Sequence, residues 1–149
     1  WVHKTANVLD KLPKSIQPSA KTLIHQMYMA PKKSEALKVY DEFMKCYQAK
    51  YPKACECLAK DKDELFIFYN YPAEHWVHIR TTNVIESAFA TVRHRTRQTK
   101  GCGSRVATLT MVYKLGLEAE KGWIKLRGHN LIIKVMGGIR FKDGLEEAA

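Results

Sequence analysis

Hydrophobic residues recur at every third or fourth position along most of the chain, the spacing that gathers side chains on one face of an α-helix. The clearest stripe consists of Leu37, Tyr40, Met44 and Tyr47. Pro18 stands near the expected start of the preceding helix and Pro31 just past its end, positions at which proline is common. Pro13 ends an earlier helix, and Pro52 opens a short one.

The second half of the chain continues the helical pattern. Residues 83 to about 97 place an apolar face along one helix, made of Val84, Ile85, Ala88, Phe89 and Val92. Two glycines in TKGCGSR (99–105) end this helix, and we expect Ser104 to cap the next one. The apolar stripe of that next helix is Val106, Leu109, Val112, Leu115, Ala119, Trp123 and Leu126.

Two further segments complete the pattern. DELFIFYNYP (63–72) is apolar without a decisive period, so a helix and a short buried strand both stay open. NLIIKVMGG (130–138) predicts a last apolar helix before a polar tail. Because strand content looks minor, the pattern predicts a mainly α fold.

Composition narrows the class of protein. A chain of 149 residues with 46% hydrophobic and 10% aromatic residues can bury a core and is neither disordered nor fibrous. No run approaches the roughly 18 apolar residues of a membrane span. The cysteines form no CxxC pair and no secretion signal accompanies them, so we expect a reduced, cytosolic setting. The same missing spacing argues against a zinc site at Cys55 and Cys57.

The net charge of +10 is concentrated in two stretches, of which residues 79–105 are the more basic. That stretch has one acid, Glu86, and six basic residues: Arg80, Arg93, Arg95, Arg97, Lys100 and Arg105. Arginine predominates, and its planar fork suits phosphate. This asymmetry favours a polyanion partner, most commonly nucleic acid, although a solvated lysine-rich surface is the simpler alternative.

Glu86 has two interpretations from the residues alone. Asn83 and Glu86 have the spacing of a capping box, in which each side chain bonds the other residue's backbone N–H. Alternatively, Glu86 is a ligand of the divalent ions used in phosphodiester chemistry. That chemistry needs several carboxylates, and no acid of the chain is singled out as a partner. Spacing therefore favours the cap and leaves catalysis open.

The stretch HIRTTNVIESAFATVRHRTRQTKGCGSRVATLTMVYKL (78–115) closely resembles the C-terminal catalytic segment of bacterial Mutator-type insertion-sequence transposases, members of the Asp-Asp-Glu transposase family. The similarity extends upstream through YPKACECLAKDKDELFIFYNYPAEHW and downstream to IRFKDG, and so covers essentially the whole chain. TTNxIES followed by arginines and KGCGSR is a specific signal.

The resemblance implies an RNase H-like catalytic domain with three metal-binding acids, Asp, Asp and Glu, in which a helical insertion separates the second Asp from the Glu. Glu86, within TTNVIES, is then the third acid. Residues 1–78 are the helical insertion region, and residues 79–149 are the C-terminal catalytic segment, with most of the sheet missing. WVH matches the end of a family Cys (or Asp)-x-x-His signature, which makes His3 a second catalytic candidate.

The implied chemistry is metal-dependent cleavage of transposon ends and strand transfer into target DNA, with Glu86 as a ligand of two Mg²⁺ (or Mn²⁺) ions. Both catalytic aspartates lie outside this chain by the same comparison, so we expect the fragment to bind DNA weakly and to cut nothing. The expected DNA-binding residues are Arg80, Asn83, Arg93, Arg95, Arg97, Lys100 and Arg105. The expected partners are transposon-end DNA, target DNA and further copies of the protein, in the bacterial cytoplasm at the nucleoid and away from any membrane.

Two other functions stay open. One is a self-contained helical nucleic-acid-binding module in which Glu86 is only a cap; the other is a helical protein-interaction domain whose basic charge is incidental. Strong salt sensitivity of DNA binding would argue against the latter. We expect Trp76 and Trp123 to pack in a core or interface rather than stack on bases. We also expect apolar faces on residues 84–92 and 106–126 to be exposed when the sheet is missing.

Overall fold

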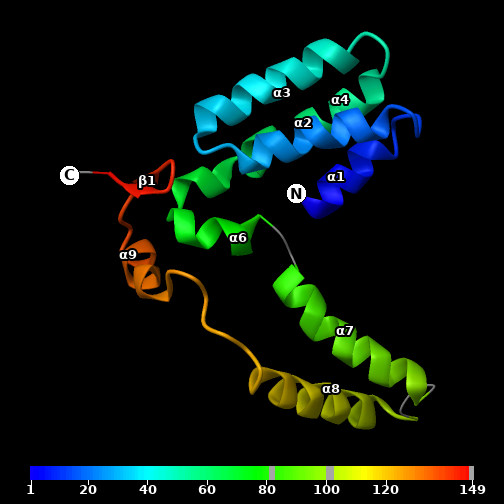
Figure 1. The fold of residues 1–149 in the computed structure, drawn as a ribbon. Helices are drawn as coiled ribbons and strands as arrows, with labels where there is room; N and C mark the ends of the chain where they lie inside the picture. Colours follow the sequence, from blue (N-terminus) through cyan, green and yellow to red (C-terminus); the bar gives the residue numbers. More distant parts are fainter. Residues whose placement is uncertain (81–82, 100–102, 148–149) are drawn as a thin grey trace.

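The computed structural model describes residues 1–80, 83–99 and 103–147, with the backbone alone at 83–85, 87 and 88 (Figure 1). Within these residues the chain is mainly helical, which confirms the mainly α fold that the apolar pattern predicts. Its N-terminal part is a helical bundle made of α1 (Val2–Leu9), α2 (Gln17–Met29), α3 (Lys33–Tyr47) and α4 (Pro52–Ala59). Pro18 and Pro52 lie in the first turns of their helices, as the sequence predicts.

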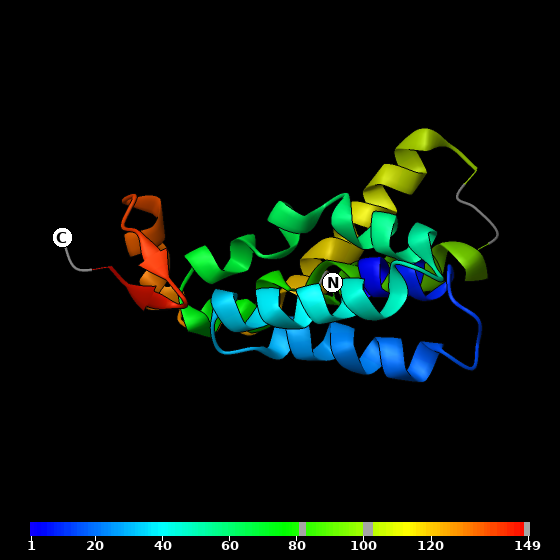
Figure 2. The same ribbon diagram turned by 90° about the horizontal axis from the view of Figure 1, so that it is seen from above.

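The core of the bundle follows from the apolar stripes. α2 packs along α3, side by side in Figures 1 and 2, while α1 packs on α4. The most deeply buried side chains come from all four helices and include Val8, Ile24, Met27, Phe43 and Leu58. Burying such side chains is the main favourable contribution to the folding of this part of the chain.

Residues 62–80, here called the linking segment, run from the bundle toward the rest of the chain. They form α5 (Lys62–Leu65), the 3₁₀ turns η1 (Ile67–Asn70) and η2 (Ala73–His75), and α6 (Trp76–Ile79). The segment that the sequence left open is therefore helical. Its aromatic rings pack together, with Tyr69 4.2 Å from Phe68 and 4.9 Å from Trp76 between ring centroids. Trp76 is buried, as expected.

The arm consists of α7 (Asn83–Gln98) and α8 (Arg105–Glu120), which pack on each other and extend away from the bundle (Figure 1). The helix predicted from Asn83 to about Arg97 is confirmed. So is the cap of α8, because the Ser104 Oγ accepts a hydrogen bond of 3.2 Å from the Ala107 N–H. Part of the predicted loop, residues 100–102, lies outside the described residues.

The apolar residues of α8 lie on all sides of the helix, yet none of its side chains is fully buried. The exposed ones include Val106, Leu109, Tyr113 and Leu117, and Phe89 on α7 is exposed as well. Such a helix is typical of positions buried in a larger assembly. The expected exposure is confirmed at Phe89 in 84–92 and at Val106 and Leu109 in 106–126, whereas Val112 and Leu115 are half-buried. The side chains of Val84, Ile85 and Ala88 lie outside the described residues. Core packing of Trp123 is wrong. That side chain lies beyond the end of α8 and is 63% exposed.

The C-terminal part contains η3 (His129–Leu131), α9 (Ile132–Met136) and a hairpin of β1 (Phe141–Lys142) and β2 (Leu145–Glu146). The strands are antiparallel, with Phe141 opposite Glu146. Asp143 and Gly144 form the two-residue turn with φ of 49° and 83°, the backbone that Asp-Gly favours. The Lys33 N–H, in the first turn of α3, donates to Asp143 Oδ1 at 2.7 Å, so the turn caps a helix that lies 110 residues earlier.

Both ends of the arm attach to the linking segment, at points that lie close together in the sequence. Arg80 ends α6 ahead of the arm, and after the arm the Arg127 N–H donates to His78 Nε2 at 3.1 Å. His75 is buried, and its Nε2 lies 2.9 Å from the Gly128 oxygen. These two histidines therefore hold the returning chain against the linking segment. Both attachments of the arm meet on residues 75–80.

The partly buried Lys4 joins the first helix of the bundle to the fourth helix and to the turn that follows it. Lys4 Nζ donates to the Cys57 carbonyl oxygen at 2.9 Å and to the Asp61 carboxylate. The hydrogen bond from Lys4 lowers the pKa of Asp61 below its ordinary value of 3.8. Because the pKa is lowered in the folded state, this carboxylate stabilises the fold above pH 3.8 and loses that contribution as the pH falls through its folded-state pKa.

We expect Asp61→Asn to lower the free energy of unfolding at neutral pH, because it leaves the Lys4 ammonium without its counter-charge. The difference from the unmodified chain should shrink as the pH falls below 3.8. Urea unfolding at several pH values measures it. Asp41→Asn, at an exposed position of α3, is the control and should have little effect. A difference that persists undiminished at low pH would contradict this account.

Gly144 provides a second test of the packing. A Cβ there would lie 2.6 Å from Ala73 Cβ and 2.9 Å from Trp76 Cζ2, at a φ of +83°. We expect Gly144→Ala to destabilise the fold by about 2–4 kcal/mol, the sum of overpacking and left-handed backbone strain. Gly138→Ala is the matched control, since its φ is +77° and its Cβ would meet nothing within 4 Å. It should cost only about 1–2 kcal/mol. Thermal unfolding measures both variants. If they lost the same free energy of unfolding, the close approach of Gly144 to Ala73 and Trp76 would contribute nothing.

Candidate active site

His3 and Glu86 meet although 83 residues separate them. His3 Nε2 lies 2.7 Å from Glu86 Oε1. The side chains are 70% and 42% exposed, respectively, so the pair is open to solvent. An ionised carboxylate only accepts hydrogen bonds, so the imidazole Nε2 is the donor. The two catalytic candidates of the sequence analysis are thus brought together.

Local structure places each member of the pair. Val8 lies in the core and fixes which side of α1 faces the bundle. His3 lies five positions earlier, about 140° around the helix, and points outward. Glu86 lies in the first turn of α7, where a carboxylate is favoured by the helix dipole. The side chain of Asn83, and with it the capping-box hypothesis, lies outside the described residues.

Four of the predicted DNA-binding residues lie exposed on the arm. Three come from the second half of α7, and the fourth opens α8: Arg93, Arg95, Arg97 and Arg105. Val92, just before Arg93, and Thr96, between Arg95 and Arg97, are half-buried. The arginines of α7 therefore project from the solvent side of the helix that presents Glu86. Lys100 lies outside the described residues.

Arg80 lies in different surroundings. Its Nε donates to the Trp76 oxygen at 3.1 Å, its Nη1 donates to the Tyr28 oxygen, and its guanidinium lies 5.6 Å from the Phe68 ring centroid. Burial lowers the pKa of Arg80. The guanidinium is thus engaged within the chain, and its predicted contact with DNA stays a prediction.

The metal-binding capacity of the described residues is partial. Glu86 supplies the hard oxygen that Mg²⁺ prefers, and a carboxylate has lone pairs for about four contacts, so bonding to His3 is compatible with binding a cation. However, the described residues contain no group of three or more His, Cys, Asp or Glu that could hold a metal ion. Glu86 fits one position of a metal site whose other ligands this part of the chain does not supply.

Sequence reasoning missed the contribution of Trp1. Its backbone nitrogen donates to the Arg80 oxygen at 2.9 Å, and its indole Nε1 donates to the Leu65 oxygen at 2.9 Å. Trp1 thereby joins the start of α1 to the end of α6. The available signal was its position two residues before His3, within the WVH match.

The comparisons with known proteins identify the family of the chain. The sequence model described as Transposase, Mutator family, matches residues 1–126. The chain therefore belongs to the Mutator family of transposases.

Individual relatives lead to the same family. The chain is 50% identical over 145 residues to the transposase for insertion sequence element IST2 of Acidithiobacillus ferrooxidans, which covers 97% of the chain and 49% of the relative. It is 49% identical over 144 residues to the transposase for IS6120 of Mycolicibacterium smegmatis, covering 97% of the chain and 45% of the relative. The chain thus spans about half the length of these relatives. No solved structure matches it significantly.

The structure also bears on membrane association. Within the described part of the chain, none of the helices combines the length and the apolar composition that crossing a bilayer requires.

Proposed function

We propose that this chain is the part of a Mutator-family transposase that presents the glutamate of an Asp-Asp-Glu catalytic centre. In this proposal residues 1–78 are the helical insertion of an RNase H-like domain, and residues 79–149 are its C-terminal segment. The observation that carries the proposal is the contact between His3 and Glu86 at 2.7 Å, in a chain whose residues 1–126 match the family.

The reaction consists of two displacements at phosphorus. In the first, water attacks the phosphorus at a transposon end, and the bond to the 3′ oxygen breaks to leave a 3′-hydroxyl and a 5′-phosphate. In the second, that 3′-hydroxyl attacks a phosphorus of target DNA, and the target strand's own 3′ oxygen leaves. Two Mg²⁺ or Mn²⁺ ions, when bound, activate the attacking oxygen and stabilise the leaving one.

Within this chain, Glu86 contributes one ligand oxygen, and His3 orients the carboxylate by donating to Oε1. The two aspartates come from a part of the enzyme outside this chain, so the chain alone binds DNA without cutting it. The DNA lies in the bacterial cytoplasm at the nucleoid, and further copies of the protein complete the active complex.

The arginines of the arm position the DNA strand. Arg93, Arg95 and Arg97 are exposed on the helix that carries Glu86, and phosphate contacts of this kind fix the register of a strand without reading its sequence. The alternative is a binding module in which Glu86 is only a cap, and the cleavage test below separates the two because it removes the charge of Glu86 and keeps the shape of its side chain.

The first test is Mg²⁺-dependent cleavage of transposon-end DNA by a transposase of the relatives' full length that contains this chain. Glu86→Gln keeps the shape of the side chain but removes its charge. We expect cleavage to fall about a hundredfold or more, because changes even to the hydrogen-bond partners of metal ligands cost about 10–100-fold. DNA affinity should change little. Glu64→Gln, at an exposed position of α5, is the control. Full cleavage by the Glu86 variant would refute the proposal.

The second test addresses the arginines. Replacing Arg93, Arg95 and Arg97 together with Gln removes three charges, so the slope of log affinity against log salt concentration should become shallower by about 0.9 for each lost phosphate contact. Replacing the exposed Lys45, Lys50 and Lys53 with Gln changes the net charge equally and is the matched control. Fluorescence anisotropy with duplex DNA measures both slopes. Equal slopes in the two triple variants would contradict a specific role of the arm.

A further inference from the structure

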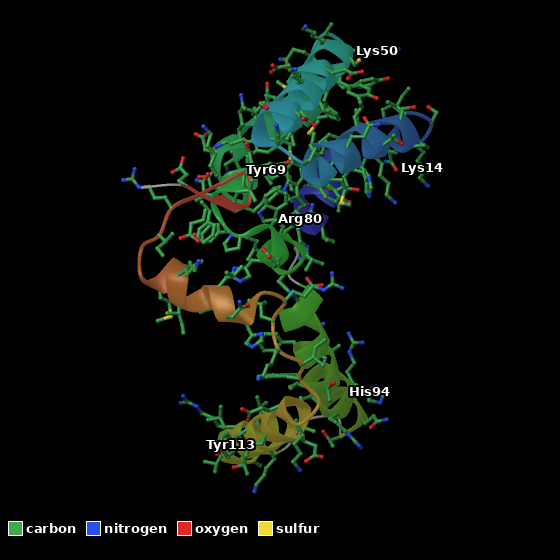
Figure 3. All side chains as sticks on the ribbon, turned by 60° about the vertical axis from the view of Figure 1, so that its left-hand side comes forward. Lys14, Lys50, Tyr69, Arg80, His94 and Tyr113 are labelled. Atoms are coloured by element: carbon green, nitrogen blue, oxygen red, sulfur yellow. The ribbon has the colours of Figure 1, made fainter. Side chains whose placement is uncertain are left out.

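Arg80 lies at the junction of the two parts of the molecule that form the candidate site. Figure 3 shows it between the bundle, on which Lys14 and Lys50 are labelled, and the arm, on which His94 and Tyr113 are labelled. It ends α6, and α7 begins three residues later in the sequence. Its side chain is directed inward, toward the bundle and the linking segment.

The guanidinium joins two backbone carbonyls of different elements. Nη1 donates to the oxygen of Tyr28, the penultimate residue of α2, and Nε donates to the oxygen of Trp76. The last carbonyls of a helix lack partners within the helix and favour a cation. A planar fork can hold two acceptors at once, whereas a lysine ammonium is a single point charge on a flexible stem. This contact therefore fixes the direction of α6 relative to α2.

Trp1 connects the same junction to α1. Its backbone nitrogen donates to the Arg80 carbonyl oxygen at 2.9 Å, and its ring centroid lies 5.5 Å from that of Tyr28. The carbonyl oxygen of Tyr28 thus accepts from the Arg80 guanidinium, and its ring packs against that of Trp1. His3 follows Trp1 by two residues, and Glu86 follows Arg80 by six. The two segments that carry the pair are therefore anchored on one cluster of Trp1, Tyr28 and Arg80.

We propose that Arg80 is a positioning residue that holds the segments bearing His3 and Glu86 in register, and that it makes no phosphate contact. The proposal rests on the function proposed above for its catalytic consequence. Its structural part, the anchoring of α7 relative to α1, stands on the geometry alone. It gives Arg80 a role different from that of the exposed arginines of the arm, although the residue type is the same.

The structural test measures the separation of α1 and α7 in the 149-residue chain. Spin labels at the exposed positions Asn7 and Thr91, on cysteines introduced into a chain without its native ones, report a distance distribution by pulsed electron resonance. We expect Arg80→Met, which keeps the stem and loses the donors, to broaden this distribution. Arg80→Lys, the milder variant should the first fail to fold, should broaden it less. An unchanged distribution in a folded variant would overturn the proposal.

The salt dependence of DNA binding distinguishes positioning from phosphate contact. We expect Arg80→Met to leave the slope of log affinity against log salt unchanged, whereas Arg97→Met should make it shallower by about 0.9. A similar loss of slope in the Arg80 variant would show that it contacts phosphate and would overturn the proposal.

The catalytic part is tested in the full-length transposase. Arg80→Met should lower the rate of Mg²⁺-dependent cleavage at saturating DNA about tenfold or more, without changing DNA affinity, because a misplaced catalytic group impairs chemistry more than binding. Arg80→Lys should restore part of the rate. If Glu86→Gln leaves cleavage intact, the proposed function fails, whereas the label distances and salt slopes still decide whether Arg80 anchors the arm. An unchanged cleavage rate in Arg80→Met, where Glu86→Gln abolishes cleavage, would overturn its positioning role.

Discussion

A buried phenol must donate its hydrogen to an acceptor or lose much of the advantage of its burial, and Tyr69 meets this constraint at the centre of the molecule. Its hydroxyl donates to the Ala30 carbonyl oxygen at 2.8 Å, just past the end of α2. Burial raises its pKa to about 12, so it keeps this hydrogen at neutral pH. Its own carbonyl accepts from the Gly144 N–H at 3.3 Å. One residue therefore joins the bundle, the linking segment and the C-terminal hairpin. Its ring also packs on Trp76, whose carbonyl oxygen accepts from Arg80.

Much of the fold could be predicted from apolar spacing and proline positions. The stripe through Tyr40 and Tyr47 identified α3, and Ser104 marked the start of α8, because such features depend on neighbours within one or two turns. The secondary structure of the linking segment could not be predicted, because its rings are buried from several sides and so define no single apolar face in the sequence. The prediction that Trp123 packs in a core, made from the apolar stripe, was wrong for a related reason. Spacing continues past Glu120, whereas the helix ends there, and the hydrophobic side chain stays exposed.

The candidate site was predictable only in part. The resemblance to the family selected Glu86 and His3, while the residues alone left Glu86 between a cap and a ligand. The structure adds the distance between them, which depends on contacts far apart in the sequence. Arg80 shows the limit most clearly: its residue type matches that of Arg93 and Arg97, but its side chain is held by backbone carbonyls of the bundle and linking segment. Residue type gives the chemistry available to a side chain and does not give its direction.

The return of the chain to α6 after the arm has a consequence for how this part of the protein can vary. Residues 75–80 hold both ends of the arm, at Arg80 and at Arg127. The segment between these two residues therefore forms a closed loop on the bundle. For a flexible connection, the entropy of closure changes by only about 0.6 kcal/mol for each doubling of its length. Residues can therefore be inserted or lost in the connections between and after the helices of the arm with little effect on the helix that carries His3. Evolution could change the reach of the arm across DNA while the junction beneath it stays the same.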